Sequence, residues 1–257
     1  MGTGAIMGNF DVAQIVLYVF WLFFAGLIFY LRREDRREGY PCESDTSGVV
    51  EPSGPVMIPS PKTFKLPEGG EAHAPSYARY EKEIKAEKIA GFAGAPLVPT
   101  GDPLVDAVGP AAYADRADHP ELTAHGAVAI VPLRVATDFS IDRPRQDPRG
   151  LDVVAADGAV AGKVTDIWVD RADPQVRYLE VDLGGDAGTR LLPANMMRLV
   201  LGVKSAVEVY ALEAAQFTNV PRLANADQVT LLEEDKIGAY FSGGRLYATP
   251  KRLGPVL

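Results

Sequence analysis

The chain begins with one long apolar run and afterwards alternates apolar and polar positions over short distances. The run covers the twenty residues from Val12 to Leu31, VAQIVLYVFWLFFAGLIFYL, and contains no charged side chain. A helix of that length spans about 30 Å, which matches the hydrocarbon core of a bilayer, and it satisfies its own backbone polar groups. The pattern therefore predicts a single transmembrane helix over residues 12–31.

The charges beside this run predict its orientation. Asp11 is the only charged residue before it, whereas four arginines follow closely: Arg32, Arg33, Arg36 and Arg37. Because Lys and Arg beside a span stay on the cytoplasmic side, we expect residues 1–11 in the periplasm and the rest of the chain in the cytoplasm. A cleaved signal peptide is disfavoured, since no basic segment precedes the run and no small-residue cleavage site follows it.

The next stretch, residues 32–126, shows no long periodic pattern. Prolines recur from Pro41 to Pro120, and each one removes a backbone donor and biases its predecessor toward extended conformations. We expect an extended, irregular segment in which 80–89 is either a short helix or a loop. Its scattered apolar residues leave two interpretations open: a flexible linker, or a segment that becomes ordered on the surface of another protein.

From Val128 onward, short alternating runs are separated by turn signals such as Asp157-Gly158. These runs cover 128–135, 151–160, 162–170, 177–183, 189–193 and 206–212. Five or six short strands with glycine turns predict a small, mainly antiparallel barrel or sandwich. A final helix is predicted after Thr230, with Glu233 completing a capping box and Gly243-Gly244 ending the helix.

Composition excludes several classes of function. A net charge of -8 and a pI near 5.0 argue against nucleic-acid binding, which rewards a basic surface. The single cysteine, Cys42, excludes a disulfide within the chain and is either a plain thiol or an acylation site. No nucleophile paired with a base, phosphate loop or metal cluster is recognisable, so we expect no catalytic site and no enzyme activity.

One polar stretch has a pattern suited to proton chemistry. The sequence DRADPQVR, from Asp170 to Arg177, places Asp170, Asp173 and Arg177 on or near one connection between strands. Two neighbouring carboxylates beside a cation are able to hold and pass a proton near neutral pH. The alternative is a solvated hairpin with surface ion pairs.

Several blocks along the chain resemble one known family. They are GNFD (Gly8–Asp11), the apolar span, REDRREGYP (Arg33–Pro41), PKTF (Pro61–Phe64), PTGDP (Pro99–Pro103), VGPA (Val108–Ala111), GKVTDIWVD (Gly162–Asp170) and LLEEDK (Leu231–Lys236). Together they resemble the H subunit of the purple bacterial photosynthetic reaction centre. The resemblance runs nearly end to end, and residues 128–212 resemble the PRC-barrel, a module that also occurs outside this family.

The resemblance implies a fold and a membrane location. The expected fold is a transmembrane helix (12–31), an extended proline-rich segment on partner subunits (32–126) and a PRC-barrel-like cytoplasmic domain with a short C-terminal helix (127–257). The chain is expected in the bacterial inner membrane, including its intracytoplasmic or chromatophore form.

The resemblance also implies partners and cofactors. The partners are the L and M subunits and membrane lipids, with a cytochrome subunit and light-harvesting antenna proteins as further candidates. The chain itself binds no cofactor, whereas the complex holds bacteriochlorophyll, bacteriopheophytin, quinones, non-haem iron and carotenoid on other subunits.

The implied role is to stabilise the L/M core and its quinone sites and to conduct protons to the secondary quinone. The proton-transfer residues implied by the resemblance are Asp170, Asp173, Arg177, Glu121, Glu234 and His125. Gln228 stands where some relatives have an acid and Ala129 where relatives have a lysine, so the resemblance does not fix the exact proton route. The alternative function is a membrane-tethered PRC-barrel adaptor for assembly or signalling.

A metal site found in relatives is not expected here. Those relatives have an acid-x-His-x-His run, whereas this chain has Thr123-Ala124-His125-Gly126-Ala127 and keeps only His125. One imidazole does not hold a transition metal tightly, so His125 is either a proton shuttle or an ordinary surface histidine.

Overall fold

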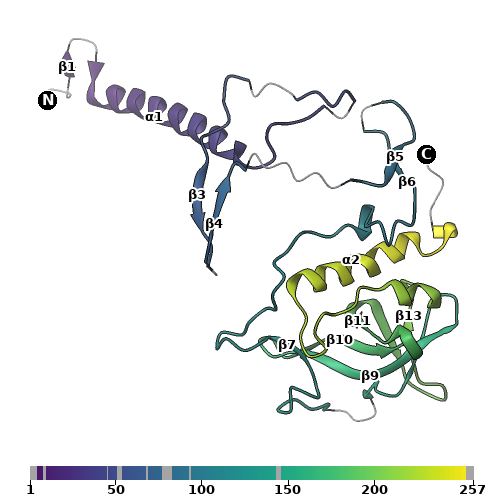
Figure 1. Ribbon diagram of the computed structural model, residues 1–257. Coiled ribbons are helices and arrows are strands. Elements are labelled where there is room, and N and C mark those ends of the chain that lie inside the picture. The colour runs from purple at the N-terminus through teal and green to yellow at the C-terminus, as the bar shows by residue number, and fades with distance from the viewer. Residues whose placement is uncertain are drawn as a thin grey trace. The chain divides into compact units, whose positions relative to one another are not determined.

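The chain forms two compact units in the computed structural model, which describes residues 5–7, 10–44, 46–50, 54–67, 69–76, 83–92, 94–142 and 146–252. The first unit comprises Met1–Glu83 and Ala90–Ala95, and the second comprises Ile84–Ile89 and Pro96–Leu257. Figure 1 labels the helices and strands of both units.

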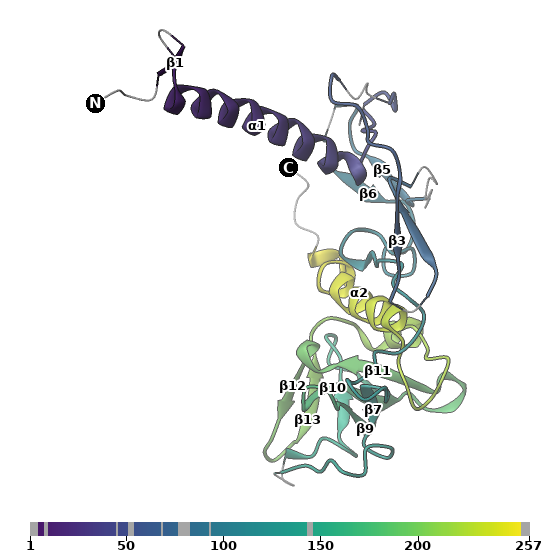
Figure 2. The same ribbon diagram turned by 90° about the vertical axis from the view of Figure 1, so that its left-hand side faces the viewer.

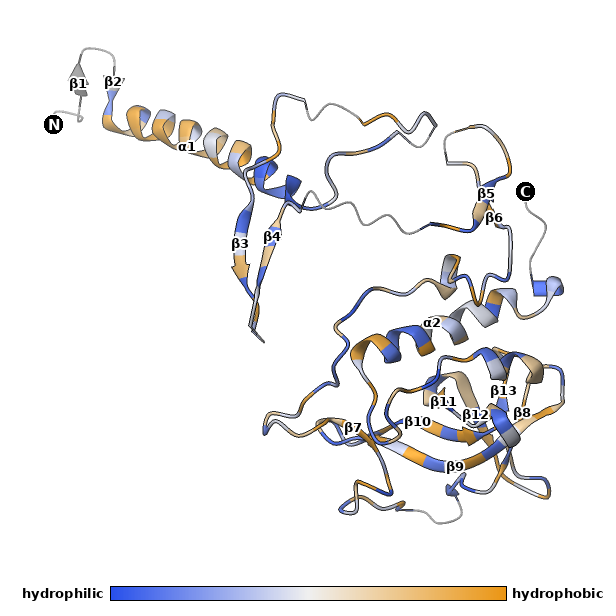
Figure 3. Cartoon of the chain, viewed as in Figure 1, coloured by the Kyte–Doolittle hydropathy of each residue, from blue (hydrophilic) through white to orange (hydrophobic). Residues whose placement is uncertain are grey.

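Helix α1 (Val12–Glu34) is the main element of the first unit and confirms the predicted apolar helix. It is long and apolar enough to cross a membrane, and none of its side chains is buried by the rest of the chain. The Asp11 side chain caps it by accepting a hydrogen bond from the Gln14 backbone N–H at 2.8 Å. Figure 3 shows the apolar body of α1 and the hydrophilic turn that follows it.

Two small hairpins accompany α1 in this unit. They pair β1 (Ala5–Met7) with β2 (Phe10–Asp11), and β3 (Lys62–Lys65) with β4 (Glu71–Ala74). Arg37, just beyond α1, donates to Glu34 and to the carbonyl oxygens of Ser60 and Ala74, each at 2.8 Å. The end of α1 is therefore fixed to the base of the β3–β4 hairpin.

A seven-stranded sheet forms the body of the second unit, in the order β11-β10-β9-β8-β13-β12 with β7 also paired to β9. All pairs are antiparallel except β8 with β13. The strands are β7 (Ile130–Pro132), β8 (Asp152–Val154), β9 (Val160–Asp170), β10 (Gln175–Asp182), β11 (Thr189–Pro193), β12 (Met197–Val200) and β13 (Ala206–Val209). The mainly antiparallel β domain expected from the alternating runs is confirmed.

Some predicted boundaries need correction. The first run, 128–135, forms only the three-residue strand β7, because a turn at 133–135 follows it directly. The strand β12 was not predicted. In the ambiguous stretch 80–89, the described part forms strand β5 (Ala86–Lys88), which pairs with β6 (Leu97–Pro99), whereas residues 80–82 lie outside the described residues.

Helix α2 (Leu231–Tyr247) covers the sheet, as Figures 1 and 2 show. The predicted capping box is present, since the Thr230 hydroxyl accepts from the Glu233 N–H and the Glu233 carboxylate accepts from the Thr230 N–H. The helix does not end at Gly243-Gly244 as predicted but continues to Tyr247.

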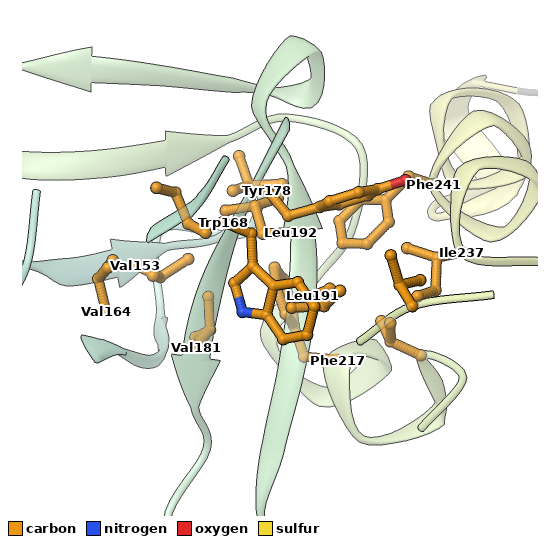
Figure 4. Close-up of a cluster of buried hydrophobic side chains, with 14 of the residues drawn as sticks. Val153, Val164, Trp168, Tyr178, Val181, Leu191, Leu192, Phe217, Ile237 and Phe241 are labelled. Atoms are coloured by element: carbon orange, nitrogen blue, oxygen red, sulfur yellow. The ribbon is translucent and has the colours of Figure 1, made fainter. Parts of the chain in front are cut away.

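The core lies between α2 and the sheet. Trp168 from β9 is fully buried there with Phe217, Ile237 and Phe241, and the rings of Phe217 and Phe241 meet edge to face at 5.9 Å (Figure 4). Full burial of each large apolar side chain contributes roughly 1.5–3 kcal/mol. This packing holds the polar residues at the ends of β9, β10 and α2 in place.

Candidate functional site

The turn between β9 and β10 carries two of the predicted carboxylates. Asp170, only 7% exposed, accepts hydrogen bonds from the backbone N–H groups of Ala172 and Asp173 at 2.9 and 3.2 Å. Asp173 is exposed and accepts a hydrogen bond from Gln175 at 2.8 Å. Asp170 therefore organises the turn, as aspartate often does, while Asp173 meets solvent.

The loop that carries Glu121 and His125 runs beside this turn. The Arg171 N–H donates to the Ala129 carbonyl oxygen at 2.8 Å, and the Ala129 N–H donates to the Glu121 carbonyl oxygen at 2.8 Å. Both Glu121 and His125 are exposed. Backbone pairing thus brings this loop next to the turn that holds Asp170 and Asp173.

A second group of residues forms where α2 meets β10. The Glu234 side chain, 9% exposed, lies 3.6 Å from the Arg177 guanidinium and accepts a 2.8 Å hydrogen bond from the Tyr178 hydroxyl. Burial, together with the negative charge of Glu234, raises the pKa of Tyr178 above its ordinary value. The phenol therefore stays protonated and remains a hydrogen-bond donor to Glu234.

Two cavities adjoin this group. They have volumes of about 350 and 410 Å³ and share Arg177, Tyr178, Gly238 and Ser242 as lining residues. Since one water occupies about 30 Å³ in the liquid, each cavity has room for several waters. Glu234 lines the larger one. A carboxylate held by a cation and a hydroxyl beside a space that holds several waters has the groups needed to accept and release protons.

The six predicted residues therefore fall into two local groups in the second unit. Asp170, Asp173, Glu121 and His125 lie on the adjoining turn and loop, whereas Arg177 of β10 pairs with Glu234 of α2. The two groups are connected through β10, which begins at Gln175, and through the bridge between Pro120 and Thr230 at the start of α2. The proton-transfer role of these residues stays a prediction.

Sequence reasoning missed several polar residues around the site. Tyr178 was assigned only to an alternating strand, and Arg116 and Asp235, which line the larger cavity with Glu234, were not singled out. Asp235 also accepts a 2.6 Å hydrogen bond from the Ala114 N–H. The sequence signal that could have pointed to Asp235 was its position directly after Glu234, in the first turns of the predicted helix.

An ion cluster on the sheet was missed as well. Arg134 lies 3.1 Å from Asp166 and 2.9 Å from Glu180, and the Trp168 indole N–H donates to Glu180 at 3.0 Å.

Within the part of the chain that the structure describes, no group of three or more His, Cys, Asp and Glu side chains is arranged to hold a metal ion.

Two family models match the sequence. The model described as "Photosynthetic reaction centre, H-chain N-terminal region" matches residues 4–135, and the model described as "PRC-barrel domain" matches residues 143–214. The first match covers just over half of the chain and includes α1 and both hairpins of the first unit. The second covers β8 to β13.

Proposed function

Because the chain belongs to the family of photosynthetic reaction centre H chains, we propose that it covers the cytoplasmic face of the L and M subunits and stabilises their quinone sites. We propose further that it conducts protons from the cytoplasm to the secondary quinone. The observation that carries the assignment to a reaction centre is the match of residues 4–135, which includes the membrane-anchoring helix. In this role the chain is a non-catalytic subunit.

Exposed apolar side chains support a docking role for the extended segment. Ile89, Leu97 and Val98 on and beside the β5–β6 hairpin are each more than 40% exposed. Such side chains in a short hairpin gain stability when a partner covers them. The L and M subunits are the proposed partners, and the bacteriochlorophyll, bacteriopheophytin, quinones, iron and carotenoid belong to the complex rather than to this chain.

The proposed topology follows from the charges beside α1. Arginines crowd the end of the helix and precede the bulk of the chain, whereas Asp11 is the only charge before it. The N-terminus accordingly lies in the periplasm, and the sheet with α2 lies in the cytoplasm of a bacterial inner membrane.

Proton conduction is supported by the contact of Glu234 with Arg177 and Tyr178 beside two cavities. The exposed Asp173, together with Glu121 and His125 on the adjoining loop, supplies groups that collect protons from solvent. A carboxylate at the surface and a second one that lines a space for several waters are the two ends that a relay needs.

The proton role is tested by Glu234→Gln in the assembled complex. This variant keeps the acceptor for Tyr178 but removes the titratable group, so the second proton-coupled electron transfer should slow by about tenfold, equivalent to about 1.4 kcal/mol in its barrier. Flash-induced proton uptake and quinone reduction measure the effect. Asp186→Asn, an exposed acid on the β10–β11 connection, is the matched control and should behave like the wild type.

The two carboxylates of the turn between β9 and β10 are tested with the double variant Asp170→Asn and Asp173→Asn. Asparagine at 170 keeps the side-chain oxygen that accepts from the turn N–H groups, so the turn should persist. Slower proton uptake with unchanged primary charge separation is the expected result. Proton uptake at the wild-type rate in both this double variant and Glu234→Gln would contradict the proton role.

The alternative is a membrane-tethered PRC-barrel adaptor for assembly or signalling, since the PRC-barrel alone does not fix a function. The H-chain match over residues 4–135 favours the reaction centre. Purification of the tagged full chain from its native membrane separates the two functions. A near-infrared pigment spectrum in the purified material is expected for a reaction centre subunit, and a colourless preparation without L- and M-like chains would exclude this assignment.

A further inference from the structure

A basic pocket lies beside the last turn of α2, and none of the six residues assigned to proton conduction lines it. It has a volume of about 390 Å³, and three arginines, Arg198, Arg245 and Arg252, contribute to its lining. Arg198 is the exposed residue of β12, Arg245 lies in the last turn of α2, and Arg252 follows that helix. We call this cavity the Arg245 pocket.

Two of the three guanidinium groups are fixed by the fold. Arg252 donates to the carbonyl oxygens of Gly244 and Tyr210, each at 2.7 Å, and to that of Ala211 at 3.1 Å. Arg198 pairs with Glu208 and lies over the Tyr210 ring, 5.5 Å from its centroid. These contacts hold both cations at the pocket without ligand, which lowers the entropic cost of binding.

Arg245 is different, because its side chain is exposed and makes no hydrogen bond or ion pair with any residue that the structure describes. Glu208, the carboxylate that pairs with Arg198, accepts hydrogen bonds from Tyr210 and Arg198, and these lower its pKa. Glu208 therefore stays charged. The residues that line the pocket include three arginines and no Asp or Glu, so the pocket is a local positive site in a chain whose net charge is -8.

The chemistry of the pocket fits a phosphate group attached to an apolar body. Planar guanidinium groups bind phosphate oxygens in pairs of hydrogen bonds. Met196, Met197 and Tyr210 supply apolar surface beside the arginines. Since α1 anchors the chain to a membrane, phospholipid is the abundant source of such a group. We propose that the Arg245 pocket binds the phosphate of an anionic phospholipid headgroup, a binding site in addition to the proposed proton role.

The test uses the full chain in a nonionic detergent and isothermal titration with short-chain phosphatidylglycerol. Arg245→Ala removes an exposed side chain without internal contacts, so the fold should persist, as far-UV circular dichroism will verify. We expect saturable binding that weakens about tenfold in Arg245→Ala and that weakens as salt screens the charges. Lys204→Ala, which removes a charge from the β12–β13 connection outside the pocket, is the control and should bind like the wild type.

Two further titrations identify the source of the phosphate. Short-chain phosphatidylcholine carries the same phosphate with a compensating cation and should bind more weakly than phosphatidylglycerol, as should inorganic phosphate, which lacks the apolar body. The proposal is overturned if phosphatidylglycerol shows no saturable binding, if Arg245→Ala and Lys204→Ala have equal effects, or if inorganic phosphate or phosphatidylcholine binds as tightly.

Discussion

The Arg134 side chain connects three separate segments of the sheet domain. It contacts Asp166 on β9 at 3.1 Å, Glu180 on β10 at 2.9 Å and Asp227 in the loop before α2 at 3.1 Å. Asp166 and Glu180 are direct partners across β9 and β10. Two carboxylates that face each other across a sheet repel, so the guanidinium between them offsets a conflict built into the strand pairing.

Replacing Arg134 with Met retains the aliphatic stem but removes this cation. We expect the free energy of unfolding to fall by about 2–3 kcal/mol, somewhat less than for a fully buried pair because Arg134 is itself 39% exposed. Urea unfolding of the full chain in detergent measures the change, with Trp21→Phe in both proteins so that the fluorescence comes from the buried Trp168.

A second arginine provides the control for this measurement. Arg149 binds Asp147 only two residues away, and its side chain is 44% exposed. Arg149→Met should therefore cost less than about 1 kcal/mol. Equal losses in the two variants would mean that Arg134 contributes no more than an ordinary surface ion pair.

The sequence predicts contacts of this kind only when the partners are close along the chain. Thr230 and Glu233, three residues apart, were identified as a capping box, and the box is present. Arg134 and Asp166 are 32 residues apart, and Tyr178 and Glu234 are 56 apart. No local pattern connects such residues, because strand pairing and the packing of α2 bring them together.

At the scale of elements, α2 continues through Gly243-Gly244, and the presence of glycine at both positions has a steric cause. A Cβ atom at Gly243 would lie 2.5 Å from the Cβ of Ala111, and one at Gly244 would lie 2.5 Å from the carbonyl oxygen of Ala211. The glycines therefore permit close packing of the helix instead of ending it. From the sequence alone, a glycine pair near the end of a helix has the same signature in both cases.

A pair of alanine substitutions in α2 separates helix propensity from this packing. Gly238→Ala has no atom within 4 Å of the new methyl group, so it should stabilise the fold by up to about 1 kcal/mol through helix propensity. Gly243→Ala gains the same propensity but forces the helix away from Ala111, and it should destabilise by about 1–3 kcal/mol. Thermal unfolding monitored by circular dichroism compares them, and two changes of the same sign would contradict the packing argument.

At the scale of the whole molecule, the two units differ in how they bury apolar surface. The core cluster lies in the second unit, between α2 and the sheet, whereas α1 and the β3–β4 hairpin of the first unit expose most of their described side chains. The proline pattern predicted an extended segment, but not its short hairpins, since three- and four-residue strands lack a periodic signal. We expect a unit with so little core to gain stability from the bilayer and from the proposed partner subunits.

The orientation of the whole chain in the membrane is testable with its one cysteine. Cys42 is exposed and lies eight residues beyond the end of α1, on the side that carries the arginines. A membrane-impermeant maleimide should therefore label Cys42 in inverted vesicles, whose cytoplasmic face is outward, and not in intact spheroplasts. Labelling that appears only after hydroxylamine treatment would indicate that the thiol is acylated through a thioester.

The matched control moves the thiol to the other side of α1. In the variant Cys42→Ser with Thr3→Cys, the labelling pattern should reverse, because residue 3 precedes the helix. The comparison is independent of pigment, partners and proton uptake, so it tests the topology alone. Labelling of Cys42 in spheroplasts would place the sheet domain on the periplasmic side, where it has no access to cytoplasmic protons, and the proposed proton role would then be excluded on topology alone.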